Sequence, residues 1–207
     1  MLSESKQVRE FTQNFFKPFC EILVRFKLSP NIISFLGVIF SLFVVIFLYF
    51  DNIYLSLFSL ILASLCDIID GNLARIYNLK SSFGAFLDSF LDRYSDFFIF
   101  LGILIIAFKN QDIFLFIFGA LALAGAFLTS YAKARAESLG VKIKVGFFER
   151  PERIIFLIIS FLSFSYSYLV FKILIILLAI FTNLTAFQRF LFVKNILCKN
   201  KMQKLNI

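Results

Sequence analysis

The chain has 207 residues, of which 60% are hydrophobic and only 16% are charged, and its mean hydropathy is +0.90. Ordinary soluble domains are about 45–50% apolar and about 25% charged, so this composition excludes a water-soluble fold and indicates an integral membrane protein. His is absent, which excludes His-ligated metal sites and leaves carboxylates, Lys, Arg, Tyr, Ser and Cys for any catalysis.

The first segment, residues 1–28, is amphipathic. Apolar residues such as Phe15, Phe19 and Ile22 recur at helical spacing among Lys and Arg residues, a pattern typical of a helix that lies in the membrane interface. Pro18 falls inside this segment, and we expect it to kink or divide the helix.

Six apolar segments follow, each long enough to cross a hydrocarbon core of about 30 Å at about 1.5 Å per helical residue. Ser29 is a plausible N-cap of the first, with Pro30 at its first helical position. We therefore predict an all-α, polytopic membrane protein with one domain over residues 1–207: the interfacial helix 1–28, a six-helix core 29–195 and a cytoplasmic tail 196–207. The predicted spans are residues 31–50, 53–76, 83–107, 113–136, 151–168 and 170–193.

The positive charges predict the orientation of these spans. Of the 21 Lys and Arg residues, only Lys109 and Lys172 lie at or near the loops around residues 51, 110 and 168. By the positive-inside rule the opposite side, which holds both termini, faces the cytoplasm. The net charge of +8 therefore reports topology in a cell membrane, and we expect no nucleic-acid partner.

Acidic residues gather in the second and third predicted spans, in the half that faces the cytoplasm. Asp67 and Asp70 are three residues apart, Asp88 and Asp92 are four apart, and Asp96 follows one turn later. Each pair shares one helical face, and the short connection between the spans favours adjacent antiparallel helices. We therefore expect four carboxylates to converge, which makes them a functional candidate because an unpaired intramembrane acid is costly.

Oxygen ligands without Cys or His favour Mg²⁺ or Mn²⁺, with Ca²⁺ a lesser alternative. A site for two such ions serves phosphate chemistry. Gly71, Ala74 and Gly84 leave room for a bulky anion beside the acids, and Arg75 offers a phosphate partner. Close packing of helices explains the small residues equally well.

Residues 67–92 follow the pattern D-x2-D-G-x2-A-R-x8-G-x3-D-x3-D. This pattern resembles the signature of the CDP-alcohol phosphatidyltransferase family at all of its fixed positions, and the overall plan of spans also looks like that family. The resemblance implies a reaction in which an alcohol displaces CMP from a CDP-linked lipid, and it suggests a homodimer.

The resemblance also implies roles for individual residues. Asp67, Asp70 and Asp88 would ligate metal, with two ions expected, while Asp92 would lie near the second ion and act as general base on the acceptor hydroxyl. The site for the CDP-lipid would involve residues of the first two spans and of the loop before the third: Asn31, Asp67, Gly71, Ala74, Arg75 and Ser81.

The segment 131–154 resembles the branch that makes phosphatidylinositol phosphate or archaetidylinositol phosphate, through its ARAESLG and ERPER portions. That likeness implies inositol phosphate as the acceptor. A helix opened by Pro151 and flanked by Arg residues suits an anion, and by analogy Lys133, Arg153 and Arg189 would bind the acceptor phosphate.

Several alternatives stay open at this stage. The basic segment fits ordinary positive-inside topology or contact with anionic headgroups. Asp96 is either part of a polar network with Arg93 and Tyr94 or a buried partner of Arg93 without a catalytic role. Glycerol 3-phosphate would suit the same anion pocket, whereas serine or a polyol fits it less well. A cation transporter is the alternative from another class, although the acids lie away from the midplane and no related halves are seen.

Overall fold

Seven helices make up the described part of the chain, in which no strand is found. The structure is a computed structural model that describes residues 6–143 and 145–204, with the side chains of 12–143 and 145–199. Residues 1–5 of the predicted interfacial segment, Lys144 of the basic segment and residues 205–207 of the predicted tail lie outside this part. The helices are α1 (Lys6–Arg25), α2 (Pro30–Tyr49), α3 (Ile53–Ile76), α4 (Ser82–Lys109), α5 (Ile113–Ser138), α6 (Arg150–Phe164) and α7 (Tyr168–Lys204).

The six apolar segments are all helical, and α2 to α5 match their predicted ranges to within two residues at each end. Ser29 occupies the N-cap position of α2 with Pro30 next to it, although the Ser29 side chain makes no capping hydrogen bond. The largest difference is in α7, which continues to Lys204. The described part of the predicted tail is therefore a helical extension.

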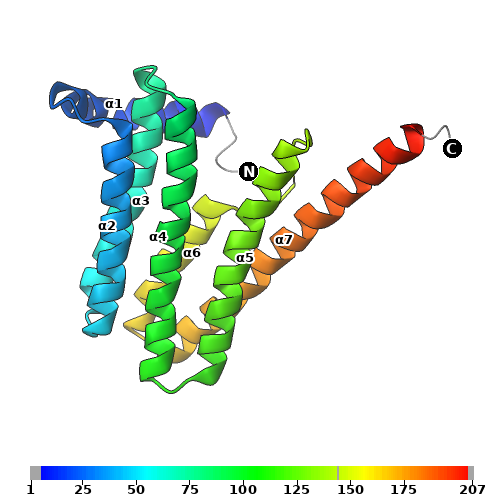
Figure 1. Cartoon of the computed structure of the whole chain (residues 1–207). Helices are drawn as coiled ribbons and strands as arrows, with labels where there is room; N and C mark the ends of the chain where they lie inside the picture. The colour runs from blue at the N-terminus through cyan, green and yellow to red at the C-terminus, as the bar shows by residue number, and fades with distance from the viewer. Residues whose placement is uncertain (1–5, 144, 205–207) are drawn as a thin grey trace.

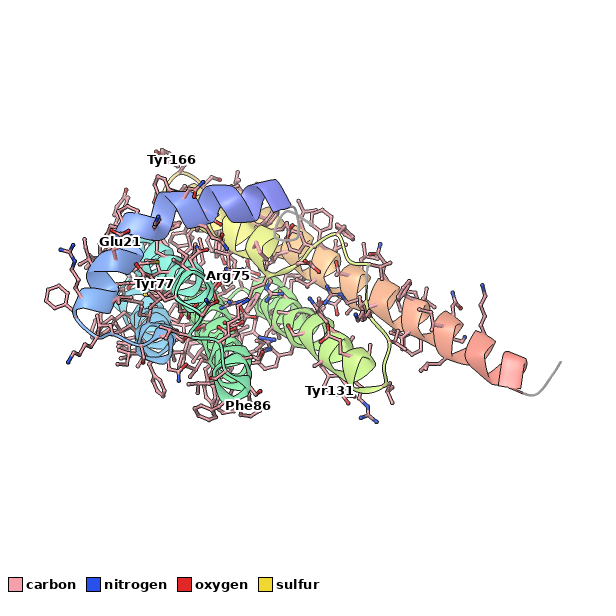
Figure 2. All side chains as sticks on the ribbon, turned by 90° about the horizontal axis from the view of Figure 1, so that it is seen from above. Glu21, Arg75, Tyr77, Phe86, Tyr131 and Tyr166 are labelled. Carbon is pink, nitrogen blue, oxygen red and sulfur yellow. The ribbon has the colours of Figure 1, made fainter. Side chains whose placement is uncertain are left out.

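Helix α1 runs without interruption through Pro18, so the prediction that Pro18 divides it is wrong. Both views show α1 lying across the ends of the upright helices (Figures 1 and 2). It is fastened there by Cys20, which is fully buried against Ile33 of α2 and Leu73 of α3. This placement is compatible with a helix in the membrane interface, which stays a prediction.

Within the described residues, four helices are long and apolar enough to cross a membrane: α2, α3, α5 and α7. Helix α6 has only 15 residues, and α4 carries several charged residues in its first half. The charges that exclude α4 by composition include the acids that the sequence singled out. Six spans therefore stay a prediction.

Helix α2 packs closely against both α3 and α4, α4 packs against α5, and α5 packs against α7, while α6 lies against α7 and α3 (Figure 1). In the described chain α3 and α4 do not form a packed pair of their own. The expectation of adjacent antiparallel neighbours is therefore wrong, because both helices use α2 as their partner. The acidic faces of α3 and α4 meet across a space that α6 enters.

The apolar core lies away from that space, among α2 to α7. Leu60, Phe100, Ile103, Phe161 and Phe171 are all fully buried in it. In a membrane, the close packing of such side chains, and not their removal from water, would hold the helices together.

The approach of α5 to α7 requires glycine at position 125. A Cβ atom there would lie 2.5 Å from Oγ1 of Thr182. Nearby, the Thr129 hydroxyl donates to the Thr182 carbonyl across 3.2 Å. These contacts hold α5 and α7 closely together beside the polar residues.

Candidate active site

Three of the predicted ligands meet between α3 and α4. Asp67, Asp70 and Asp88 each place one carboxylate oxygen within 4.8 Å of the other two. Asp70 is buried and the other two are half-buried. Three converging carboxylate oxygens are the ligand set of a hard divalent cation, so these residues fit the ion that the sequence predicts.

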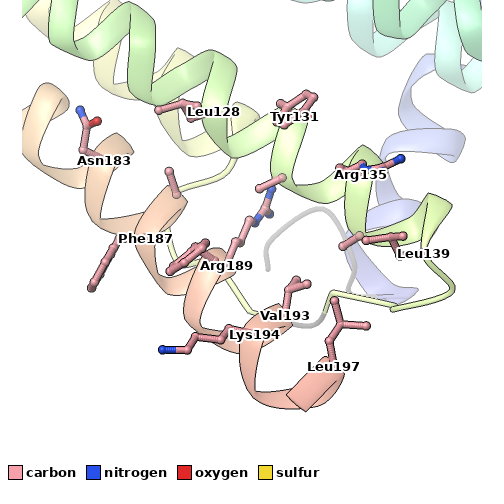
Figure 3. Close-up of a pocket in the computed structure, with 14 residues that line it drawn as sticks. Leu128, Tyr131, Arg135, Leu139, Asn183, Phe187, Arg189, Val193, Lys194 and Leu197 are labelled. Carbon is pink, nitrogen blue, oxygen red and sulfur yellow. The ribbon is translucent and has the colours of Figure 1, made fainter. Parts of the chain in front are cut away.

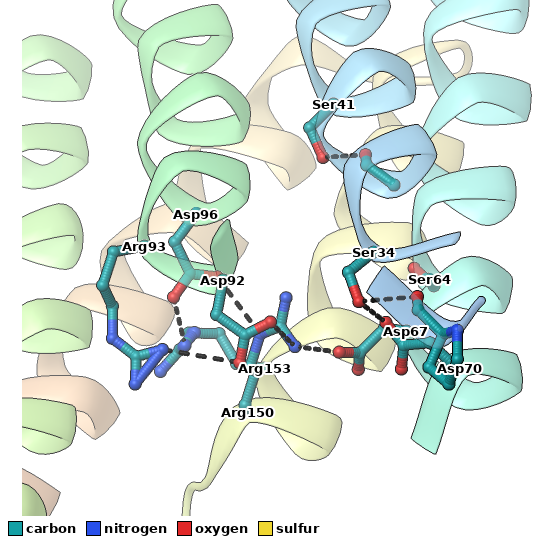
Figure 4. A network of polar contacts seen from close by, with 12 residues as sticks. Ser34, Ser41, Ser64, Asp67, Asp70, Asp92, Arg93, Asp96, Arg150 and Arg153 are labelled. Atoms are coloured by element: carbon teal, nitrogen blue, oxygen red, sulfur yellow. Dashed lines mark hydrogen bonds and ion pairs between the residues drawn. The ribbon is translucent and has the colours of Figure 1, made fainter. Parts of the chain in front are cut away.

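Asp92 does not join this group, because its carboxylate is held by arginine. Nη1 of Arg150 lies 2.7 Å from Oδ1 of Asp92 and 2.5 Å from Oδ1 of Asp67, and so bridges α4 and α3 (Figure 4). Arg93 reaches the other oxygen of Asp92 at 3.5 Å. The structure therefore brings three of the four predicted ligands together and places a guanidinium between that group and the fourth.

Ser34 of α2 is a site residue that the sequence reasoning missed. Its hydroxyl donates to Oδ2 of Asp70 across 2.5 Å and also lies 3.2 Å from the carbonyl of Pro30. This bond orients Asp70 from α2, the helix that packs against both α3 and α4. Ser34 stands one turn after the entry to the first span, and only that position could have suggested it.

A cavity of about 180 Å³ opens on one side of the carboxylates, between the start of α2, the end of α3 and the start of α4. Four of the residues predicted to contact the CDP-lipid line it: Asn31, Gly71, Ala74 and Ser81. Lys80, which the sequence analysis did not select, lines it too. Asp67 belongs to the adjoining carboxylate group and does not line this cavity.

Small residues keep this cavity open. A Cβ atom on Gly84 would lie 2.9 Å from Oγ of Ser81 and 3.4 Å from Oδ1 of Asn31, and Ser81 caps α4 by accepting a hydrogen bond from the Gly84 amide. Arg75 does not line the cavity. Its Nε instead donates to the carbonyl of Gly71 across 2.7 Å, so the predicted phosphate partner is folded back along its own helix.

A second cavity, of about 320 Å³, lies on the other side of the carboxylates. All three residues predicted to bind the acceptor phosphate line it: Lys133, Arg153 and Arg189. Arg93 and Arg150, which were not assigned to that pocket, line it as well. Five cationic side chains outnumber the three acids that also line this cavity, Asp92, Glu137 and Glu149, and so form a suitable environment for a phosphorylated ligand.

All four of these arginines are paired with acids: Arg93 and Arg150 contact Asp92, and Arg153 and Arg189 have partners of their own. Nη2 of Arg153 lies 2.6 Å from Asp96, and both side chains are almost fully buried, at 1% and 2% exposure. Asp96 therefore pairs with Arg153, and more loosely with Arg150 at 3.8 Å. The alternative that made Asp96 the buried partner of Arg93 is wrong.

Arg189 makes more contacts than Arg153 does. Its guanidinium contacts Glu149 at 2.5 Å and donates to the carbonyls of Thr129 and Val145 at 2.8 and 3.2 Å. These bonds tie α7 to α5 and to the loop before α6. Arg189 is thus fixed in place at the wall of the cavity.

A third, small cavity joins the other two. It shares Ser34 and Asp70 with the first cavity and Asp92 and Arg150 with the second. The three cavities therefore lie in a row. The carboxylates stand between the first cavity, which is lined by small residues, and the second cavity, which is lined by cationic residues. Asp92 and Arg150 stand at the boundary with the cationic space.

A hollow of about 700 Å³ lies between α5 and α7 and shares Arg189 with the cationic cavity (Figure 3). Its walls are mostly apolar, with Leu128, Phe187, Phe190 and Leu197 among them. The carboxylates do not line it.

The family model described as CDP-alcohol phosphatidyltransferase matches residues 27–187. The chain is 40% identical to the archaetidylinositol phosphate synthase of Methanothermobacter thermautotrophicus over 61% of this chain and 63% of that one. It is 33% identical to the enzyme of the same name from Pyrococcus horikoshii, over 81% of this chain and 84% of that one.

Solved structures give the same result. The phosphatidylinositol phosphate synthase of Mycobacterium tuberculosis with CDP-DAG bound is 30% identical, with a TM-score of 0.78 over 89% of this chain and 94% of that one. The same enzyme in complex with manganese and citrate is 31% identical, with a TM-score of 0.78 over 85% and 87% of the two chains.

Proposed function

The chain belongs to the CDP-alcohol phosphatidyltransferase family, and from this we propose that it transfers the phosphatidyl-type group of a CDP-lipid to inositol phosphate and releases CMP. The observation that carries the choice of acceptor is the cation-lined cavity, which meets the carboxylates at Asp92. An acceptor that already bears a phosphate needs such a cavity. The names of the relatives support the same choice.

In the proposed reaction, the acceptor hydroxyl attacks the phosphorus that carries the lipid, and the bond from this phosphorus to the oxygen of CMP breaks. Asp92 accepts the hydroxyl proton as general base. Lys133, Arg153 and Arg189 hold the acceptor phosphate. The CDP-lipid is bound by Asn31, Asp67, Gly71, Ala74, Arg75 and Ser81, with Arg75 turning from the Gly71 carbonyl to a phosphate.

Asp67, Asp70 and Asp88 would hold Mg²⁺ or Mn²⁺, with Asp92 contributing to a second ion. Bound divalent ions polarise a diphosphate and neutralise the charge of the departing CMP. The manganese in the M. tuberculosis enzyme and the all-oxygen cluster of three acids support this proposal. We also propose six spans, a homodimer, and an active site on the cytoplasmic face of the cell membrane.

The test is a panel assay on the purified protein with a CDP-lipid and Mg²⁺ or Mn²⁺. Inositol phosphate, glycerol 3-phosphate, serine and free inositol are supplied in turn, CMP release is measured, and the lipid product is identified by its mass. We expect the highest kcat/KM with inositol phosphate. A clear preference for glycerol 3-phosphate would favour the alternative acceptor, and no CMP release with any alcohol would contradict the proposal.

Two variants separate the proposed roles. Lys133→Ala should raise the KM for inositol phosphate at least tenfold and leave the KM for the CDP-lipid nearly unchanged, because Lys133 lines only the cationic cavity. Asp92→Asn should reduce kcat by a factor of about 10²–10⁴, the usual contribution of a general base, while the CDP-lipid still binds. Undiminished CMP release by Asp92→Asn would remove Asp92 as the base.

A further inference from the structure

Arg150 takes a position at the centre of the site that none of the proposed roles explains. The same nitrogen, Nη1, contacts Asp67 on α3 and Asp92 on α4 at 2.5 and 2.7 Å. Its Nε makes no hydrogen bond and approaches Asp96 only at 3.8 Å. The guanidinium is therefore directed at the carboxylates that face each other across the gap between the two helices.

The Arg150 guanidinium compensates negative charge of the carboxylates on α3 and α4. Five carboxylates lie close together on α3 and α4, and an uncompensated acid in a membrane interior is costly. Asp96 is balanced mainly by Arg153, which leaves Arg150 as the principal cation for Asp67 and Asp92. Arg150 thus compensates the negative charge of these two acids, as a metal ion bound between them would.

The Arg150 guanidinium and a divalent cation compete for the position between Asp67 and Asp92. Both would be bound by Asp67, and two positive groups on neighbouring oxygens of one carboxylate repel each other strongly in a region of low dielectric constant. Full metal loading therefore requires Arg150 to withdraw from Asp67 and Asp92. Withdrawal would leave a bare guanidinium, which needs a new anionic partner.

The structure offers a place for the displaced side chain. Arg150 is the first residue of α6, and its side chain lines the cationic cavity as well as the small carboxylate cavity. Asp92 is the only other residue common to these two cavities. In the cationic cavity Arg153 and Arg189 are already engaged by Asp96 and Glu149. A guanidinium released from the carboxylates could pair with an incoming phosphate there.

We infer that Arg150 is a built-in counter-cation that alternates between two partners. It bridges Asp67 and Asp92 when the site lacks its full set of metal ions, and it turns to the acceptor phosphate when the site is loaded. The inference rests on the proposed function, since it takes the metal and the phosphorylated acceptor from there. It predicts that metal binding and acceptor binding strengthen each other, by the same factor in both directions.

The first test measures Mn²⁺ binding to the purified protein without substrate, by titration calorimetry and by the loss of the free Mn²⁺ EPR signal. Arg150→Gln should bind Mn²⁺ at least tenfold more tightly than wild type, because the competing cation is gone. Arg135→Gln is the matched control, because this substitution also removes one positive charge from the same end of the protein. Arg135 is exposed, and its Nη1 contacts Ser138. This variant should bind Mn²⁺ as wild type does, and an Arg150→Gln affinity equal to or weaker than the control would overturn the inference.

The second test measures the coupling, with inositol phosphate and inorganic phosphate as separate probes. For wild type, Mn²⁺ should tighten inositol phosphate binding at least fivefold, and in Arg150→Gln this gain should disappear. Arg150→Lys, which keeps the charge but loses the planar fork, should retain part of the coupling. A gain of the same size in wild type and Arg150→Gln would contradict the second position of the side chain.

The outcomes separate this inference from the proposed function. If wild type binds no Mn²⁺, the metal proposal and the inference both fail. If wild type binds Mn²⁺ and releases CMP in the panel assay, yet Arg150→Gln changes neither affinity nor coupling, the inference alone fails. Thermal unfolding of each variant with and without Mn²⁺ verifies that the proteins compared are folded.

Discussion

The pair Asp96–Arg153 shows how single residues in this site serve two purposes. Arg153 is expected to bind the acceptor phosphate, yet its guanidinium is 1% exposed and its Nη2 lies 2.6 Å from Asp96. Nε of Arg153 has no hydrogen-bond partner among the described residues. That buried nitrogen faces no protein acceptor, so the side chain retains a donor for a ligand while its charge stabilises the fold.

Truncation of Arg153 should therefore affect stability as well as binding. Arg153→Ala leaves the Asp96 carboxylate buried and uncompensated, and we expect a loss of about 3–5 kcal/mol in the free energy of unfolding. The double variant Arg153→Ala/Asp96→Ala should recover a large part of this loss, because no lone charge remains. Thermal and denaturant unfolding in detergent measure both effects, with Lys133→Ala, which should unfold as wild type does, as the control. Equal destabilisation of the single and double variants would show that the ion pair is not what Arg153 contributes.

At the scale of elements, the junction of α5 and α7 at the end of the molecule opposite the site is held by one carboxylate. Asp112 caps α5 by accepting a hydrogen bond from the Leu115 amide at 3.0 Å, and Lys172 of α7 reaches it at 2.7 Å. Tyr168 donates to the same carboxylate at 3.1 Å. One residue thus stabilises a helix start and ties it to the start of the last helix.

This junction predicts a pH dependence. Burial alone would raise the pKa of Asp112, but the hydrogen bonds from Lys172, the Leu115 amide and Tyr168 outweigh it and hold the pKa below its ordinary value. A lowered folded-state pKa means that the contribution is complete above the unfolded pKa of about 3.9 and is lost as the pH falls through the folded value. The difference in melting temperature between wild type and Asp112→Asn should be largest near pH 7 and should shrink below about pH 4. Thermal unfolding of both proteins from pH 7 to pH 3 measures it, and a constant difference over that range would contradict the assignment.

Helices were the most predictable part of this protein, because apolar length and the capping pattern are local properties. The ranges of α2 to α5 and the convergence of Asp67, Asp70 and Asp88 follow from the printed sequence. The positions of Ser34 and Arg150 do not, because each depends on which helix lies between or beside α3 and α4. The assumption that a short connection implies direct packing was wrong for the same reason: α2, which precedes both helices in the chain, became their common partner.

At the scale of the whole molecule, the basic residues define one end. Arg75, Lys80 and Arg135 lie at the end of α3, just before α4 and at the end of α5, whereas Lys109 and Lys172 lie at the opposite end of the molecule and pair with Asp51 and Asp112. The positive-inside rule counts Lys and Arg residues and not net charge, so this asymmetry in their number is what predicts the orientation.

This asymmetry predicts the accessibility of the two kinds of loop. In a background in which Cys20, Cys66 and Cys198 are replaced by Ser, a cysteine at Gln111 should react with a membrane-impermeant maleimide in intact cells. A cysteine at Lys142 should react only after the membrane is opened. Labelling of the denatured proteins controls for intrinsic reactivity. The reverse pattern would place the carboxylates at the outer face of the membrane and contradict the proposed orientation.

Helix α2 packs against both α3 and α4, so it helps to set the distance between the two helices that carry the acids. Gly37 of α2 faces α3 so closely that a Cβ atom would lie 3.3 Å from Cβ of Cys66, and Gly37 also lines the small carboxylate cavity. A larger residue there would act as a wedge, pushing α3 outward and moving Asp67 and Asp70 away from Asp88. The tolerance of the active centre to mutation is therefore set partly by a residue with no side chain, in a helix that carries none of the catalytic acids.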